Sequence, residues 1–160
     1  MIPSLVIGSL LLLSSNLYAT EMAEASLKHF SSTSKIEWQH DLGPAQEIAE
    51  TNNRPLLLFF TATWCGPCQS VKRTTMQDPS VIRELSKNFV PVMLDFDQHR
   101  FLASQMNISV VPTIMVLNPS ATGLLHKVTN TSGSMFIREL QTAKKMHGEE
   151  RTIKKTGLSR

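Results

Sequence analysis

The sequence predicts an α/β fold in which a central mixed β-sheet is flanked by helices on both faces. The first observation is the unbroken apolar run at residues 56–60, which is typical of a strand buried on both faces. The second is the order of the patterns, a strand–helix–strand unit followed by a hairpin and a last helix. The third is the composition of the 160 residues, 41% hydrophobic and 18% charged, which fits one packed domain.

The first helix is expected at residues 41–53. Pro44 is tolerated there because it falls in the first turn, and Pro55 separates the helix from the strand at 56–60. Helical spacing places four apolar side chains on one face, namely Leu42, Ala45, Ile48 and Ala49.

Two more helices are expected before the next strand, residues 90–96. The pattern is helical from Pro67 to about Met76, and it starts again at Asp78, which can cap a helix that has Pro79 in its first position. One face of this second helix carries Val81, Ile82, Leu85 and Phe89.

The last part of the chain is expected to hold a short helix, a hairpin and a final helix. These elements are a helix marked by Phe101, Leu102 and Met106, strands at 114–117 and 124–129 joined by the turn-rich residues 118–123, and an amphipathic helix at 135–146.

Four segments are expected along the chain: a signal peptide at 1–19, a linker at 20–35, the folded domain at 36–146 and a basic flexible tail at 147–160. The apolar run at 5–13 and the small residue Ala19 have the layout of a secretory signal. The run is shorter than the ~20 apolar residues that span a bilayer. We therefore expect export to the periplasm with removal of the signal, and the alternative is a membrane anchor formed by an uncleaved amino terminus.

The carboxyl-terminal end is basic, with six basic and two acidic residues from Lys144 onward. Such an end can attract nucleic acid or anionic lipid. It contains no aromatic residue that could form a base-stacking platform. We therefore expect a solvated tail and no nucleic-acid partner.

The chain has two cysteines, Cys65 and Cys68, separated by two residues. A bridge between them closes almost no loop, so structural stapling is not its expected purpose. Thiol–disulfide exchange instead needs an attacking thiolate and a second thiol close enough to release the mixed disulfide. We expect Cys65, at the positive end of a helix, to be the nucleophile, and Cys68, one turn later, to be the resolving thiol.

A metal site is the competing interpretation of the cysteine pair. Zinc uses the same spacing but needs four ligands, and the chain has no second cysteine pair. The five histidines are scattered without ligand spacing, at His29, His40, His99, His126 and His147. We expect no metal and no cofactor other than the redox-active Cys65–Cys68 disulfide.

The run Trp64-Cys65-Gly66-Pro67-Cys68 resembles the active site of the thioredoxin superfamily residue for residue, and Val111-Pro112-Thr113 is a second mark of that family. The resemblance covers roughly residues 36–145 and implies a thioredoxin fold. Trp38, the helix before the strand, and Met76-Gln77-Asp78-Pro79 resemble the exported subgroup that includes the carboxyl-terminal domain of DsbD and the reductase DsbH. In the family the matching proline is cis and faces the cysteines, and the backbone before it pairs with substrate. The resemblance thus implies a substrate-binding set of Trp64, Gly66, Pro67, Val111 and Pro112.

Two positions depart from the family pattern. Thioredoxins carry a buried Asp and a Lys on neighbouring strands, where this chain has Phe59 and Met93. Without a nearby carboxylate we expect the pKa of Cys65 to lie below that of thioredoxin, and the proton of Cys68 to leave through water or Asp95. Asp95 and Asp97 alternate along one strand face, which favours a solvated or hydrogen-bonded pair over a catalytic base.

The expected function is reduction of disulfides in exported proteins by a monomer that an upstream thiol donor recharges, with a membrane protein of the DsbD type as the candidate donor. The Gly66-Pro67 dipeptide favours the reducing direction. The alternatives are a disulfide oxidase or isomerase, and a module that binds copper or zinc for delivery.

Overall fold

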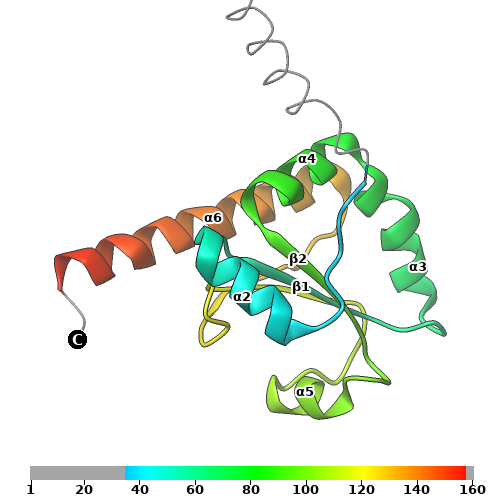
Figure 1. Cartoon of the computed structure of the whole chain (residues 1–160). Coiled ribbons are helices and arrows are strands. Elements are labelled where there is room, and N and C mark those ends of the chain that lie inside the picture. The colour runs from blue at the N-terminus through cyan, green and yellow to red at the C-terminus, as the bar shows by residue number, and fades with distance from the viewer. Residues whose placement is uncertain (1–34, 158–160) are drawn as a thin grey trace, which may run out of the picture. The chain divides into compact units, whose positions relative to one another are not determined.

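Four strands form the sheet of the computed structural model, which describes residues 35–157. Their bounds are β1 Leu56–Thr61, β2 Val90–Asp95, β3 Thr113–Leu117 and β4 Leu124–Lys127, and their order is β2-β1-β3-β4. Strand β2 is parallel to β1, whereas β3 is antiparallel to both β1 and β4. The sheet is therefore mixed, as expected (Figure 1).

Helices cover both faces of this sheet, which confirms the expected fold class. They are α2 Leu42–Asn52, α3 Gly66–Arg73, the 3₁₀ turn η1 Thr75–Gln77, α4 Pro79–Asn88, α5 Arg100–Gln105 and α6 Gly133–Thr156. One core cluster joins the sheet to α3, α4 and α6, and a second joins the opposite face to α2 and α5.

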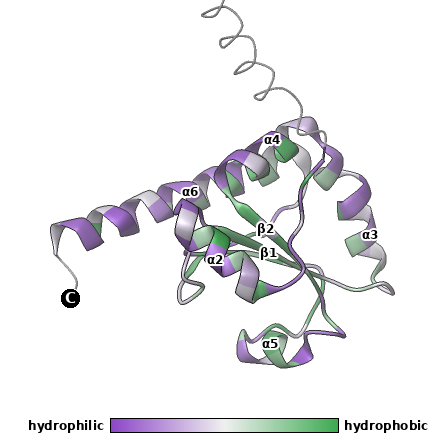
Figure 2. Cartoon of the chain, in the orientation of Figure 1, coloured by the Kyte–Doolittle hydropathy of each residue, from purple (hydrophilic) through white to green (hydrophobic). Residues whose placement is uncertain are grey.

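Strand β1 is the centre of the fold because successive side chains enter opposite cores. Leu57 and Phe59 lie in the cluster with α3, α4 and α6, while Leu58 and Phe60 lie in the cluster with α2 and α5. All six residues of β1 are buried, and the strand is correspondingly apolar in Figure 2. Packing on two sides fixes the carboxyl end of β1, where the cysteine motif begins.

Two aspartates start helices, and the sequence predicts the cap at Asp78. Oδ1 of Asp41 accepts a hydrogen bond from the Gly43 N–H at 3.0 Å, and Oδ1 of Asp78 accepts one from the Ser80 N–H at 2.7 Å. Each bond satisfies a donor that the first helical turn leaves free.

The helix after the cysteine motif is shorter than expected. It ends at Arg73 and is followed by the separate turn η1, so the expected continuous helix to Met76 is wrong in its last turn. The Thr75 hydroxyl donates to the backbone oxygen of Thr131, which ties η1 to the loop before α6. This tertiary contact competes with a further α-helical turn.

The last helix is longer than expected. Helix α6 begins at Gly133 and continues to Thr156, so its expected end at Met146 is wrong and residues 147–156 are helical. His147 is buried, and Glu150 accepts a hydrogen bond from Asn118 Nδ2 at 3.2 Å. Ion pairs one turn apart, Lys145–Glu149 at 3.9 Å and Glu150–Lys154 at 3.4 Å, favour the extension. Figure 1 shows the final turns projecting past the sheet.

The segment before α2 lies along the outer edge of β2. The Gln39 N–H donates to Pro91 O at 2.9 Å, and the Met93 N–H donates to Gln39 O at 2.8 Å. Trp38 packs on Phe59 with ring centroids 6.2 Å apart. The segment therefore pairs with part of an otherwise open sheet edge.

The expected signal peptide at 1–19 and nearly all of the linker at 20–35 lie outside the described residues. Within residues 35–157, no helix is long and apolar enough to cross a membrane.

Glu139 joins α6 to the sheet and gives a first prediction. It accepts hydrogen bonds from the Thr129 hydroxyl at 2.7 Å and from the Thr129 N–H at 3.3 Å, and it pairs with His126 of β4. The hydrogen bond from the Thr129 hydroxyl, followed by the one from His126, holds the pKa of Glu139 below its ordinary value of 4.5. The stability that the carboxylate contributes is complete above pH 4.5 and is lost as the pH falls through the lower folded-state pKa.

We expect Glu139→Gln to lower the free energy of unfolding by about 1–2 kcal/mol at neutral pH. This difference from the wild type should shrink as the pH falls through the folded-state pKa, because the wild-type carboxyl is then protonated. Urea unfolding across that pH range measures it. Glu149→Gln, which changes an exposed carboxylate of the same helix, is the control. A Glu139→Gln effect that is the same at every pH would contradict the assignment.

Candidate active site

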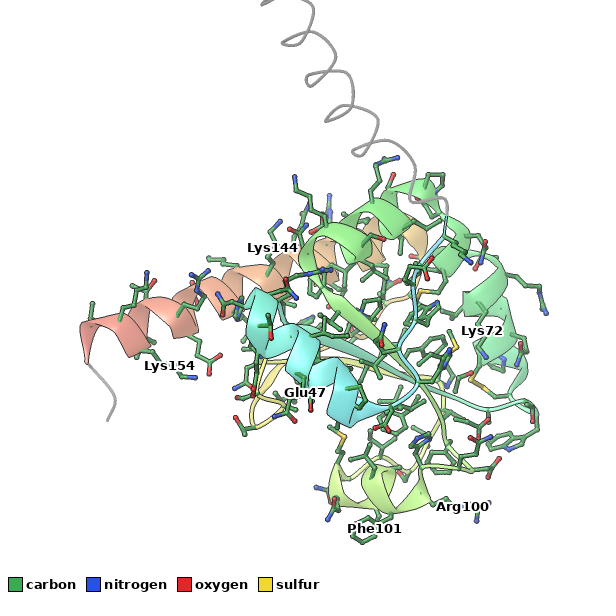
Figure 3. The ribbon with its side chains drawn as sticks, viewed as in Figure 1. Glu47, Lys72, Arg100, Phe101, Lys144 and Lys154 are labelled. Carbon is green, nitrogen blue, oxygen red and sulfur yellow. A yellow bond between two sulfur atoms is a disulfide. The ribbon has the colours of Figure 1, made fainter. Side chains whose placement is uncertain are left out.

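The cysteine pair lies at the junction of β1 and α3. Cys65 is the N-cap residue of α3, Pro67 occupies its first turn, and a disulfide joins Cys65 to Cys68 with Cα atoms 5.3 Å apart. The disulfide is drawn as a yellow bond beside α3 in Figure 3. Proline is favoured at this point because its missing N–H has no partner in a first helical turn. The local sequence therefore forms the helix start that holds both sulfurs.

The first turn of α3 is directed at the Cys65 sulfur. Sγ of Cys65 accepts a hydrogen bond from the Cys68 backbone N–H at 3.2 Å. The first turn of α3 contains no acidic residue, while Lys72 and Arg73 lie in its last turn. A free N–H and the positive end of the helix dipole both stabilise negative charge on that sulfur once the disulfide is reduced.

Cys68 is less exposed than Cys65, as expected, although the difference is small. Cys68 has no exposed surface and Cys65 has 3%. The neighbouring Trp64, by contrast, is 65% exposed, which is more than a side chain with a packing role alone would show. An exposed indole therefore lies next to the nearly buried Cys65.

The base of the site is apolar where thioredoxins carry charges. Phe59 and Met93 lie opposite each other in the β1–β2 register, and Phe59 is fully buried. Near the end of β1, the buried Thr61 hydroxyl has no hydrogen-bond partner among the described residues. The two departures seen in the sequence thus form one apolar contact beneath the motif.

The second family mark lies at the same end of the sheet. The peptide bond between Val111 and Pro112 is cis, and Thr113 pairs with Phe60 where β3 begins and β1 ends. Pro112 and Pro67 line one common cavity. The fold thus brings the proline loop to the cysteine motif across more than 40 residues of sequence.

A hydrogen-bond chain that the sequence does not reveal runs along the rim of the site. The Trp64 indole N–H donates to Asp97 Oδ2 at 2.7 Å, and Arg100 Nη2 contacts Asp97 Oδ1 at 2.6 Å. Asp95 caps the same turn, since its Oδ1 accepts the Asp97 and Gln98 N–H groups at 2.9 and 3.2 Å. Asp95 and Asp97 are therefore hydrogen-bonded within the rim, where Asp97 positions the tryptophan.

This contact gives a second prediction. The hydrogen bond from Trp64, followed by the one from Arg100, lowers the pKa of Asp97. We expect Trp64→Phe to raise the pKa of Asp97 toward its ordinary value, short of reaching it, because Arg100 remains. NMR titration of the Asp97 carboxyl measures the change, and Trp38→Phe, on the buried tryptophan–phenylalanine contact, is the control. An Asp97 titration that is unchanged in Trp64→Phe would show that the indole does not hold the carboxylate.

The hydrogen-bond partners of the described histidines are protein groups other than the cysteines. His126 pairs with Glu139, while His40, His99 and His147 lie within hydrogen-bond distance of backbone oxygens. Over residues 35–157, no group of three His, Cys, Asp or Glu side chains is arranged to hold a metal ion.

Comparison with known proteins agrees with this arrangement. The model of the thioredoxin-like family matches residues 37–119. A thioredoxin-like protein of Synechocystis is 33% identical over 96 residues, which cover 59% of this chain and 87% of the relative. The thioredoxin-related protein DsbJ of Chlamydia pneumoniae is 27% identical over 120 residues, which cover 68% of this chain and 33% of DsbJ. Two other thioredoxins that the chain matches are covered over only 40% and 59% of their length.

A solved structure titled DsbH oxidoreductase superposes with a TM-score of 0.61 at 19% identity, over 69% of this chain and 85% of the other. At this identity the likeness concerns the fold alone. The family match, however, includes β1, the cysteine pair and the cis-proline loop. The chain therefore belongs to the thioredoxin-like family and carries a disulfide-bonded Cys-x-x-Cys pair.

Proposed function

We propose that the protein reduces disulfides in exported proteins through Cys65 and Cys68. The observation that carries this proposal is the position of the Cys65 sulfur, which caps α3 and accepts the Cys68 N–H at 3.2 Å. A sulfur held in this way favours the thiolate, which is the species that attacks a disulfide.

The proposed reaction starts from the reduced pair and has two exchanges. The Cys65 thiolate attacks one sulfur of a substrate disulfide, the substrate S–S bond breaks, and the other substrate sulfur leaves as a thiolate that takes up a proton. Cys68 then gives up its proton and attacks Cys65 in the mixed disulfide. The second substrate thiol is released, and the protein is left with the Cys65–Cys68 disulfide present in the structure. An upstream dithiol donor returns two electrons and two protons to the pair.

Five residues around the sulfurs are proposed to bind the substrate. Trp64, Gly66 and Pro67 are exposed beside the nucleophile. The cis-peptide between Val111 and Pro112 lies at the same end of the sheet. We expect the backbone at Val111 to pair with an extended substrate segment in strand fashion.

The reduction potential, measured against glutathione, tests the direction of the reaction. We expect a reducing value together with catalysis of insulin-disulfide reduction by the dithiol. A strongly oxidising value would favour a disulfide oxidase or isomerase instead. Stoichiometric zinc or copper in protein purified without chelator, together with inactivity toward insulin, would favour a metal-delivery module.

The proposed location is the periplasm, with residues 1–19 as a cleaved signal and a monomeric domain after it. The proposal rests on the apolar run followed by Ala19. Mass spectrometry of the protein recovered from a periplasmic fraction is expected to find an amino terminus at Thr20. Recovery of the full-length chain from the membrane fraction would favour the uncleaved anchor.

Mixed disulfides captured by the Cys68→Ala variant would identify the substrates and the electron donor, including any membrane donor of the DsbD type.

A further inference from the structure

A cavity of about 640 Å³ opens beside the cysteine motif. Four parts of the chain bound it: α3, the turn from Thr74 to Asp78, the cis-proline loop, and the start of α6. Pro67 of the cysteine motif and Pro112 of the cis-proline loop both belong to its wall. The cavity is thus placed to receive a side chain close to the substrate cysteine.

Asp78 is the one charged side chain among the residues that line this cavity. Its Oδ1 accepts the Ser80 N–H at 2.7 Å and so caps α4. Its Oδ2 lies 3.7 Å from the position that a Cβ atom would take at Gly133 of α6. In the part of the chain that the structure describes, no Lys, Arg or His side chain forms an ion pair with Asp78. One carboxylate oxygen therefore remains available to a ligand.

Three of the five hydroxyl groups that line the cavity already donate their proton, while those of Ser70 and Thr131 can still donate or accept. The Thr74 hydroxyl donates to Ser70 O at 2.9 Å, the Thr75 hydroxyl donates to Thr131 O, and the Ser132 hydroxyl donates to Asn130 Oδ1 at 2.7 Å. A hydroxyl whose single proton is already donated offers only its lone pairs to a ligand. Together with the Asp78 carboxylate, such lone pairs fit an ammonium or guanidinium group, which only donates.

The start of α6 would attract an anion, because backbone N–H groups of a first helical turn and the positive end of the helix dipole lie there. Asp78 already supplies a carboxylate beside Gly133. A second anion in the cavity would therefore meet a like charge, whereas a cation would not.

We propose that this cavity, through Asp78, selects disulfides that have a Lys or Arg side chain close to the cysteine that Cys65 attacks. The inference rests on the proposed reductase function, and it deepens that function by naming the class of substrate. Asp78 acts here on the specificity of binding and takes no part in the exchange of sulfurs.

The test compares disulfide-linked peptides that differ only in one residue near the cysteine, which is Lys, norleucine or Glu. We expect the wild-type kcat/KM to be roughly fivefold higher for Lys than for norleucine, which is the upper range for a part-exposed ion pair. High salt should weaken this preference. Asp78→Asn should remove this preference, because the asparagine oxygen still caps α4 but carries no charge. Asp41→Asn, which changes the matching cap of α2, should retain it.

The outcomes separate the two proposals. If the wild type reduces all three peptides equally, prefers Glu, or keeps its Lys preference in Asp78→Asn, the inference is wrong and the reductase function stands. If the wild type reduces none of the peptides, the proposed function is wrong. The cavity is then tested by adding peptides that have Ser in place of Cys and following the NMR amide shifts of Thr75 and Gly133. Shifts that are equal for the Lys and norleucine peptides, or that persist in Asp78→Asn, would then overturn the inference.

Discussion

Replacing Cys65 by Ser is expected to lower the rate of disulfide reduction by about three orders of magnitude or more, as removal of a nucleophile commonly does. A serine hydroxyl does not ionise near neutral pH, so no anion forms at the start of α3 to attack a substrate disulfide. The one thiol that remains is that of Cys68, which lies inside α3 rather than at its N-cap and has no exposed surface. Insulin reduction with a chemical dithiol as donor measures the loss.

Cys68→Ser is the matched control, because it makes the same atomic change at the other sulfur. It keeps the nucleophile and removes the resolving thiol, so we expect a mixed disulfide between Cys65 and substrate to accumulate on non-reducing gels. Capture of substrate by Cys65→Ser in place of Cys68→Ser would reverse the two roles. Reductase activity that persists in Cys65→Ser would remove the basis of the proposed function.

The sequence predicts the parts of this site that depend on neighbouring residues. The unbroken apolar run of β1 predicts a strand buried on both faces, since no polar side chain interrupts it. The caps at Asp41 and Asp78 are equally local, because a capping side chain bonds the backbone two residues later. The position of the cysteine pair at a strand–helix junction follows directly from these signals.

Contacts between residues that are distant in the chain cannot be predicted from local sequence patterns. The hydrogen bond from Trp64 to Asp97 spans 33 residues of sequence, and the one from Thr75 to Thr131 spans 56. Each depends on how α3 packs against the loops around it, and no periodic pattern marks the partners. The extension of α6 beyond Met146 was missed for a related reason. Its basic residues indicated a solvated tail, whereas the burial of His147 and the contact from Asn118 to Glu150 arise only in the folded chain.

Replacing Phe59 by Ala is expected to lower the free energy of unfolding by about 3–5 kcal/mol, the usual range for a buried aromatic residue. Phe59 is fully buried in β1, its ring packs on Trp38, and it belongs to the core beneath the cysteine motif. Its removal leaves a cavity between the sheet and the helices on that face. The backbone of β1 is held by pairing on both sides, so it cannot easily shift to fill the cavity. Urea unfolding monitored by circular dichroism measures the change.

Phe101→Ala is the matched control, because the same side chain is removed from a position that is 77% exposed. The Phe101 ring projects outward from α5 in Figure 3, and its loss should change stability by less than about 0.5 kcal/mol. Equal effects of the two substitutions would show that Phe59 is not packed as described. A large effect confined to Phe59→Ala would instead support apolar packing at the position where thioredoxins bury a carboxylate. A proton that leaves Cys68 then needs another acceptor.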